Sequence, residues 1–290
     1  MTPELLQDGP ESDPGINQRA IMQLFEAADG RNKDIEYEIN VSMMEIYNEK
    51  IKHLKANLDV QKQYGGPLLR DLLGTSSSPL AIRLGEDGHL SIPGLREVRV
   101  TSVDHVIEVL REGRKNKAVA STEANACSSR SHVIVRVIVS AKNIITGTTS
   151  IGKPRRLNLV DLAGSERVSQ TNATGQLLRE AQAINNFTSL QLLRVKVKCI
   201  FSRSLSELGN VVFALRQNQK HIPFRNCQLT RILEDSLNGD SKTLVIVHLS
   251  PDAAHSNESA SSISFAEKIG HVQTKLRRDT AIRRSGTSGR

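Results

Sequence analysis

Apolar residues recur every three or four positions in three segments, which is the spacing of one face of a helix. Residues 15–29 show it at Ile16, Ile21 and Phe25, and residues 101–119 show it after Thr101 or Ser102, either of which can cap a helix. Residues 261–276 follow the same spacing at the end of the globular part. The pattern therefore predicts amphipathic helices in all three segments.

Apolar runs, some of them rich in β-branched residues, separate these helical segments and predict strands. The runs occupy residues 35–49, 133–141, 156–162 and 242–250. The first run alternates and then becomes continuously apolar, as expected near the middle of a sheet. Because strands alternate with helices, we predict an α/β fold with a mostly parallel central sheet sandwiched by helices.

Length and composition narrow the class of protein. The 290 residues, 38% of them hydrophobic, are enough for one large or two ordinary domains. No apolar run approaches the roughly 20 residues that cross a bilayer, and the start of the chain lacks the features of a signal peptide. Three scattered cysteines fit a reducing compartment. We expect a protein of the cytosol or the nucleus without a membrane partner.

The charge balance indicates an acidic partner. The chain carries a net charge of +8, and residues 275–290 hold six Lys or Arg against one Asp, which predicts a basic, disordered tail. Aromatic residues make up only 3% of the chain, so few side chains could stack on bases. The composition speaks against a nucleic-acid partner.

The segment NACSSRSH, residues 125–132, concentrates polar side chains immediately before a predicted buried strand. The hydroxyls of Ser128 and Ser129 can bind phosphate oxygens or a magnesium ion, and Arg130 offers a forked donor that matches phosphate or carboxylate.

The segment DLAGSE, residues 161–166, follows another predicted strand. Asp161 can hold magnesium-bound water, the amide of Gly164 can approach a terminal phosphate, and Glu166 can pair with Arg130. Alone, each segment is equally consistent with a cap or a turn. Together, beside two strands, they predict a site that senses a terminal phosphate.

Seven ordered blocks of the sequence resemble landmarks of the kinesin motor domain, over about residues 15–271. The blocks are VSMMEIYNEKI, NACSSRSH, LNLVDLAGSER, LREAQAIN, SLSELGNVVFAL, HIPFRNCQLTRILEDSLNGDSKTLVIVHLSP and SISFAE. The phrasing around LNLVDLAGSER is most similar to the kinesin-14 group, which has C-terminal motors.

The resemblance implies a P-loop NTPase-like microtubule motor that uses ATP with Mg. Asn125 and Ser128 would then lie near the γ-phosphate, Ser129 would bind the metal, and Asp161 would hold it through water. Arg130 would bridge to Glu166, and Gly164 would report the γ-phosphate to the helix that begins near LREAQAIN.

The same resemblance implies a microtubule partner and a location on the cytoskeleton. Lys220, Arg225 and Arg231 are the candidate contacts to acidic tubulin, although ordinary solvated charges would explain them too. Dimerisation would depend on regions outside these residues.

The sequence also departs from the family pattern. Kinesin motors carry a phosphate loop of the form G-x-x-x-x-G-K-[ST], which these residues lack, so the resemblance implies a motor domain that is incomplete on its N-terminal side. GTTSIGKP, residues 147–154, fails at Pro154 and leads into a strand where a phosphate loop must open a helix. A connection between two neighbouring strands explains it better.

The predicted organisation has three parts. Residues 1–14 form a disordered segment, residues 15–274 a partial motor domain, and residues 275–290 the tail. Two insertions are expected, a surface loop at about 52–69 and an alternating segment at 186–202 that interrupts the relay helix.

Three functional hypotheses follow. The first is a kinesin-type motor domain whose ATP hydrolysis is left open by the missing phosphate loop. The second is a non-hydrolysing microtubule-binding protein, and a nucleic-acid binder is third.

Overall fold

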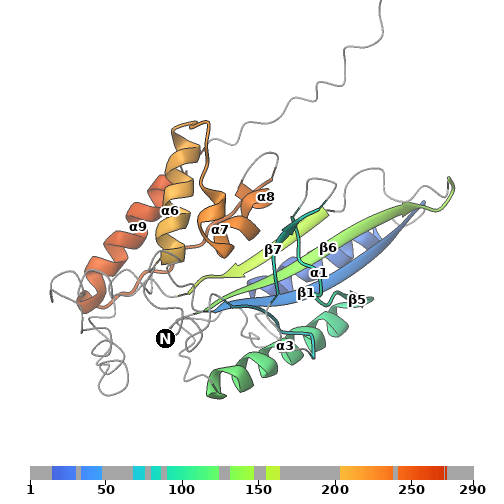
Figure 1. Ribbon diagram of the computed structural model, residues 1–290. Helices are drawn as coiled ribbons and strands as arrows, with labels where there is room; N and C mark the ends of the chain where they lie inside the picture. The colour runs from blue at the N-terminus through green and yellow to red at the C-terminus, as the bar shows by residue number, and fades with distance from the viewer. Residues whose placement is uncertain are drawn as a thin grey trace, which may run out of the picture. The chain divides into compact units, whose positions relative to one another are not determined.

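The computed structural model describes two parts of the chain separately (Figure 1). The described residues are 15–30, 34–47, 68–75, 80–85, 90–123, 131–146, 155–163, 203–237, 241–270 and 272. The chain divides into one unit of Met1–Arg203 and a second of Ser204–Arg290. Both predicted disordered ends and the segment 186–202 lie outside the described residues, as does the helix expected near LREAQAIN.

The first unit is built on a sheet centred on one long strand. β1 (Ile35–Tyr47) pairs along its whole length with β6 (Ser131–Asn143), and β6 pairs with β7 (Arg155–Asp161). The other edge of β1 is shared by β2 (Leu68–Asp71) and β5 (Val98–Val100). A separate two-stranded ribbon joins β3 (Arg83–Leu84) and β4 (Leu90–Ser91).

The α/β class is confirmed, but the expectation of mostly parallel strands is wrong for the described sheet, because each of its pairings is antiparallel. The reason lies in the connections. The connection between Asn143 at the end of β6 and Arg155 at the start of β7 is shorter than the dozen or so residues that a crossover between parallel neighbours needs, whereas an antiparallel pair requires only a short link. The predicted link at 147–154 indeed falls between these two neighbouring strands.

Two helices pack on one face of this sheet (Figure 1). α1 (Ile16–Asp29) and α3 (Val103–Glu123) confirm the predicted helices, and the Ser102 hydroxyl accepts a hydrogen bond from the His105 amide at the start of α3, at 3.2 Å. The shared core joins alternate residues of β1 and β6 to the inner faces of the helices. It includes Ile21, Val41, Met43, Val106, Leu110, Val133, Val135 and Val137.

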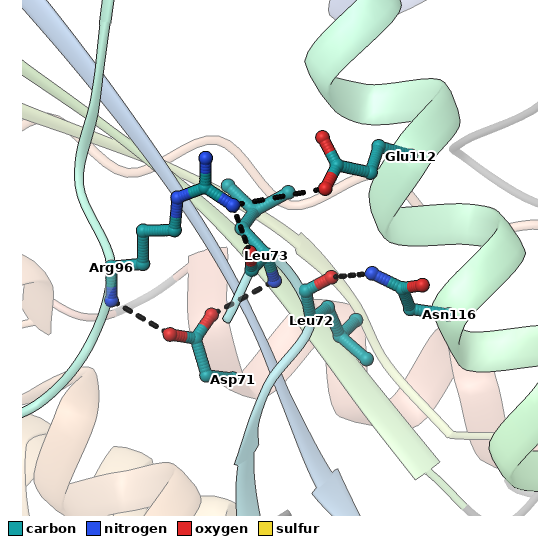
Figure 2. Close-up of polar contacts among 6 residues, drawn as sticks. All are labelled: Asp71, Leu72, Leu73, Arg96, Glu112 and Asn116. Atoms are coloured by element: carbon teal, nitrogen blue, oxygen red, sulfur yellow. Dashed lines mark hydrogen bonds and ion pairs between the residues drawn. The ribbon is translucent and has the colours of Figure 1, made fainter. Parts of the chain in front are cut away.

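A group of polar contacts fixes the chain beyond β2 (Figure 2). The Asp71 carboxylate accepts hydrogen bonds from the amides of Leu73 and Arg96, at 2.9 and 2.7 Å. The Arg96 guanidinium donates to the Leu73 carbonyl and lies 3.7 Å from Glu112 of α3. These contacts tie β2, the approach to β5, and α3 together. β2 itself corrects the predicted loop at 52–69, because Leu69 is a fully buried strand residue; residues 52–67 lie outside the described part.

The regular elements described in the second unit are helices. It contains α6 (Arg203–Arg216), the short helix η3 (Phe224–Asn226), α7 (Gln228–Ile232), α8 (Glu234–Leu237), η4 (Ala253–His255) and α9 (Ser256–Gly270). α9 begins five residues before the predicted closing helix and includes residues 256–260. No described helix combines the length and apolarity that spanning a bilayer would require.

The predicted strand at 242–250 is wrong for the described structure. Its residues form no strand, and Leu244 is 83% exposed. The β-branched pattern is present, but a strand needs a neighbour to satisfy its amides and carbonyls, and none of the described strands pairs with this segment.

Candidate functional site

The two polar segments singled out in the sequence adjoin neighbouring strand ends at the same end of the sheet. β6 begins at Ser131, directly after residues 125–130, and β7 ends at Asp161, directly before residues 162–166. Because the strands are antiparallel neighbours with Val133 opposite Asp161, the start of one lies beside the end of the other. The sheet therefore places the first residues of β6 and the last residues of β7 side by side.

Most of the predicted site residues fall outside the described part of the chain. These are Asn125, Ser128, Ser129, Arg130, Gly164 and Glu166. The predicted pairing of Arg130 with Glu166 thus stays a prediction. Asp161 is described and half-buried at the end of β7.

The paired ends of β6 and β7 are held by side chains as well as by the ladder. The Arg136 guanidinium of β6 donates a hydrogen bond of 3.0 Å from Nε to Oδ1 of Asn158, directly opposite on β7. Arg136 is only 8% exposed, so this bond is formed away from bulk water. A buried, charged donor that finds its acceptor only on the opposite residue favours this pairing register of β6 and β7 over registers shifted along the strands.

A buried histidine joins the two segments directly. Nδ1 of His132, at the start of β6, accepts a hydrogen bond of 2.9 Å from the amide of Ala163, two residues beyond β7. Because an amide can only donate, Nδ1 carries no proton, and the ring is the tautomer protonated at Nε2. His132 is 3% exposed and Ala163 7%, so the bond is shielded from water.

Burial also sets the charge of this ring. It lowers the pKa of His132 to about 4, since an imidazolium would lose its hydration in the protein interior. The ring is therefore neutral at pH 7 and keeps Nδ1 free to accept. The sequence interpretation included His132 in its polar segment but gave it no role. The available signal was a histidine among the first residues of an otherwise apolar buried strand.

One described residue bears on a magnesium site. Asp161 offers a carboxylate at a strand end, which suits an ion that keeps several of its waters and binds through one or two carboxylates. The described residues contain no group of three or more His, Cys, Asp or Glu side chains that could hold a metal directly. Asp161 can therefore contact such an ion through one of its waters.

The three predicted microtubule contacts come from one short stretch of the second unit. Lys220 follows α6, Arg225 lies in η3, and Arg231 lies in α7. Lys220 and Arg225 are exposed, whereas Arg231 is half-buried. Two of the three cations are thus exposed to solvent.

Buried hydrogen bonds hold this stretch in shape. The Thr230 hydroxyl is fully buried and donates to the Phe224 carbonyl at 2.7 Å, and the Cys227 sulfur accepts from the Thr230 amide at the start of α7. Asn226 donates to Glu207 of α6 at 2.7 Å. These hydrogen bonds therefore hold in place the backbone segment that carries the exposed cations.

Comparisons with known proteins identify the family of this chain. The model of the kinesin motor domain family matches residues 5–272. The kinesin-like protein klp-3 of Caenorhabditis elegans is 66% identical over 268 residues, which cover 92% of this chain and 38% of that protein. The kinesin-like protein KIN-14R of Arabidopsis thaliana is 40% identical over 92% of this chain and 21% of its own length.

Solved structures show the same likeness. A fast kinesin, studied for its ATPase mechanism and interactions with microtubules, superposes with a TM-score of 0.71 at 33% identity, over 95% of this chain and 68% of that one. The motor and motor homology domain of Kar3Vik1 give a TM-score of 0.63 at 31% identity, over 90% and 58%. This chain spans less than two fifths of the two relatives named above. The predicted resemblance, including its kinesin-14 character, is confirmed, and the chain belongs to the kinesin motor domain family.

Proposed function

We propose that this chain acts as a kinesin-type motor unit on microtubules of the cytoplasmic cytoskeleton, with an affinity for the microtubule that depends on bound nucleotide. The observation that carries the proposal is that the start of β6 and the end of β7 lie side by side, held by the register of the two strands and by the bond from Ala163 to His132. Two loops that join neighbouring strand ends can both contact one terminal phosphate.

In this proposal the nucleotide is ATP with Mg, and each predicted residue has one task. Asn125, Ser128 and Gly164 approach the γ-phosphate, while Ser129 binds the metal and Asp161 holds it through water. Arg130 and Glu166 form the ion pair that closes the site. Catalysis of phosphoryl transfer rests almost wholly on such positioning and charge neutralisation.

The microtubule-facing part is the stretch that carries Lys220, Arg225 and Arg231. Exposed cations on a fixed backbone raise the rate and strength of association with an acidic surface such as that of tubulin. The net charge of +8 acts in the same direction.

A second candidate is a microtubule-binding protein that does not hydrolyse ATP. It is favoured by the sequence between β6 and β7, where the one near match to a phosphate loop ends in Pro154. Proline supplies neither a hydroxyl for magnesium nor an amide for phosphate.

Co-sedimentation of the whole chain with microtubules separates the candidates. We expect binding that differs between a non-hydrolysable ATP analogue and ADP by about tenfold, which corresponds to about 1.4 kcal/mol of coupling between the two sites. Equal affinity in both nucleotides would favour the second candidate. Absence of binding in either nucleotide would overturn both.

A further inference from the structure

We propose that His132 is a positioning residue that couples the two polar segments, so that a change in one is passed to the other. The inference rests on the proposed function for its consequence, which is the response of microtubule binding to nucleotide. The contact itself is independent of that function: Nδ1 of His132 accepts the Ala163 amide at 2.9 Å.

The position of the bond makes it a link between the segments. His132 follows residues 125–131 without a break, and Ala163 immediately precedes Gly164 in the sequence. Both partners are buried, so an Ala163 amide that moved away would lose its acceptor where water cannot replace it. A shift of His132 or of Ala163 must therefore carry the other residue along or break this bond.

Packing alone does not explain a histidine at this place. Ile46 lies directly opposite on β1, and Ile134 lies two residues along β6 on the same face; they are 1% and 0% exposed. An apolar side chain would suit these surroundings, and burying an imidazole there is unfavourable unless its nitrogens find partners. The bond to Ala163 is one such partner and supplies what an apolar residue could not.

Three variants separate the bond from mere packing. His132→Asn keeps an acceptor at the δ position, His132→Leu removes it while filling the space, and Ile134→Val removes one methyl group from the same face without touching the bond. Each variant and the parent chain is assayed by microtubule co-sedimentation with the ATP analogue and with ADP, and by hydrogen exchange of the Ala163 amide.

We expect the affinity ratio between the two nucleotides to fall from about tenfold to near one in His132→Leu. The ratio should be retained within about twofold in His132→Asn and Ile134→Val. Exchange of the Ala163 amide should accelerate at least tenfold in His132→Leu alone. A ratio that survives in His132→Leu, or that is lost equally in Ile134→Val, would overturn the inference.

The amide measurement keeps the inference apart from the proposed function. If the parent chain shows no nucleotide response, the proposed function fails, and exchange then decides the link by itself. Fast exchange confined to His132→Leu would support it, and equal exchange in His132→Leu and the parent would refute it.

Discussion

A single neutral imidazole illustrates how the interior of this chain controls its polar groups. His132 is held uncharged by burial, and in that form its Nδ1 accepts the amide of Ala163. Protonation would remove the acceptor and place a charge beside apolar strand residues. The residue therefore combines a structural contact with a built-in sensitivity to acid.

The first prediction concerns acid stability. The pKa of His132 is about 4 in the folded chain and about 6.5 when unfolded, so below pH 6.5 the unfolded chain takes up the proton first. The free energy of unfolding contributed by this ring is fully present above pH 6.5 and is lost as the pH falls toward 4. Between pH 7 and 5 the loss is about 2 kcal/mol.

Urea unfolding of the parent and of His132→Asn at both pH values tests this. Other groups titrate in both proteins, so only the difference between them is informative. We expect the parent to lose about 2 kcal/mol more than the variant. Parallel losses in the two proteins would contradict the prediction.

A second residue-scale prediction concerns Thr230. Its buried hydroxyl donates to the Phe224 carbonyl at 2.7 Å, so Thr230→Val should leave that carbonyl without this donor and lower the free energy of unfolding by about 1–3 kcal/mol. Thr230→Ser keeps the hydroxyl and serves as the control for the lost methyl group. Denaturation in urea, followed by circular dichroism, should show Val as the more damaging change; a greater loss in Ser would refute the role of the bond.

At the scale of elements, the packing of α3 on β1 depends on a close approach. A Cβ at Gly113 would collide with Sδ of Met43, which is fully buried in the core. Gly209 of α6 offers the matched case, because a Cβ there meets no atom within 4 Å. One glycine permits contact between elements, whereas the other only weakens its helix.

The third prediction contrasts these two glycines. Gly113→Ala should lower the free energy of unfolding by about 1–3 kcal/mol through overpacking. Gly209→Ala should raise it by up to about 1 kcal/mol, since alanine is the better helix former. Opposite shifts of the urea midpoint are expected. A stabilising Gly113→Ala would show that α3 does not approach β1 this closely.

The elements that the sequence predicted correctly are those whose apolar pattern directly indicates which residues are buried. α1 and α3 carry a periodic apolar face, β1 alternates before it becomes apolar, and β6 and β7 are apolar runs; each is found. Residues 242–250 carry an equally strong β pattern but form no strand, because pairing depends on a distant neighbour that no local pattern encodes. Strand direction was missed for the same reason.

The candidate site was predicted in part. Composition alone marked residues 125–132 and 161–166, and the register of β6 with β7 brings their strand ends together. The link from Ala163 to His132 could not be predicted, because it joins residues 31 positions apart through the fold. Only Asp161 among the predicted phosphate-side residues is described, so the remaining roles stay predictions.

At the scale of the whole molecule, the basic charge and the two units indicate that each unit has a function of its own. The first unit carries the paired strand ends, and the second carries Lys220 and Arg225 on a braced backbone. We propose that the former responds to nucleotide and the latter contacts the microtubule.

The fourth prediction tests whether the second unit contacts the microtubule. Replacing Lys220 and Arg225 together by alanine should weaken microtubule binding roughly fivefold at low salt, and the effect should shrink as salt is added. Lys115→Ala removes an exposed charge from α3 of the first unit and controls for net charge. An equal loss in Lys115→Ala would show that total charge, and not this surface, governs binding.

The most direct test of the account is the dependence of microtubule affinity on nucleotide in Asp161→Asn, a change of charge with almost no change of shape at the end of β7. The parent chain should bind with affinities that differ about tenfold between an ATP analogue and ADP in the presence of Mg. Asp161→Asn should abolish that difference, whereas the control Asp252→Asn in the second unit should retain it. A parent chain with equal affinities, or an Asp161→Asn variant that keeps the difference, would contradict the account.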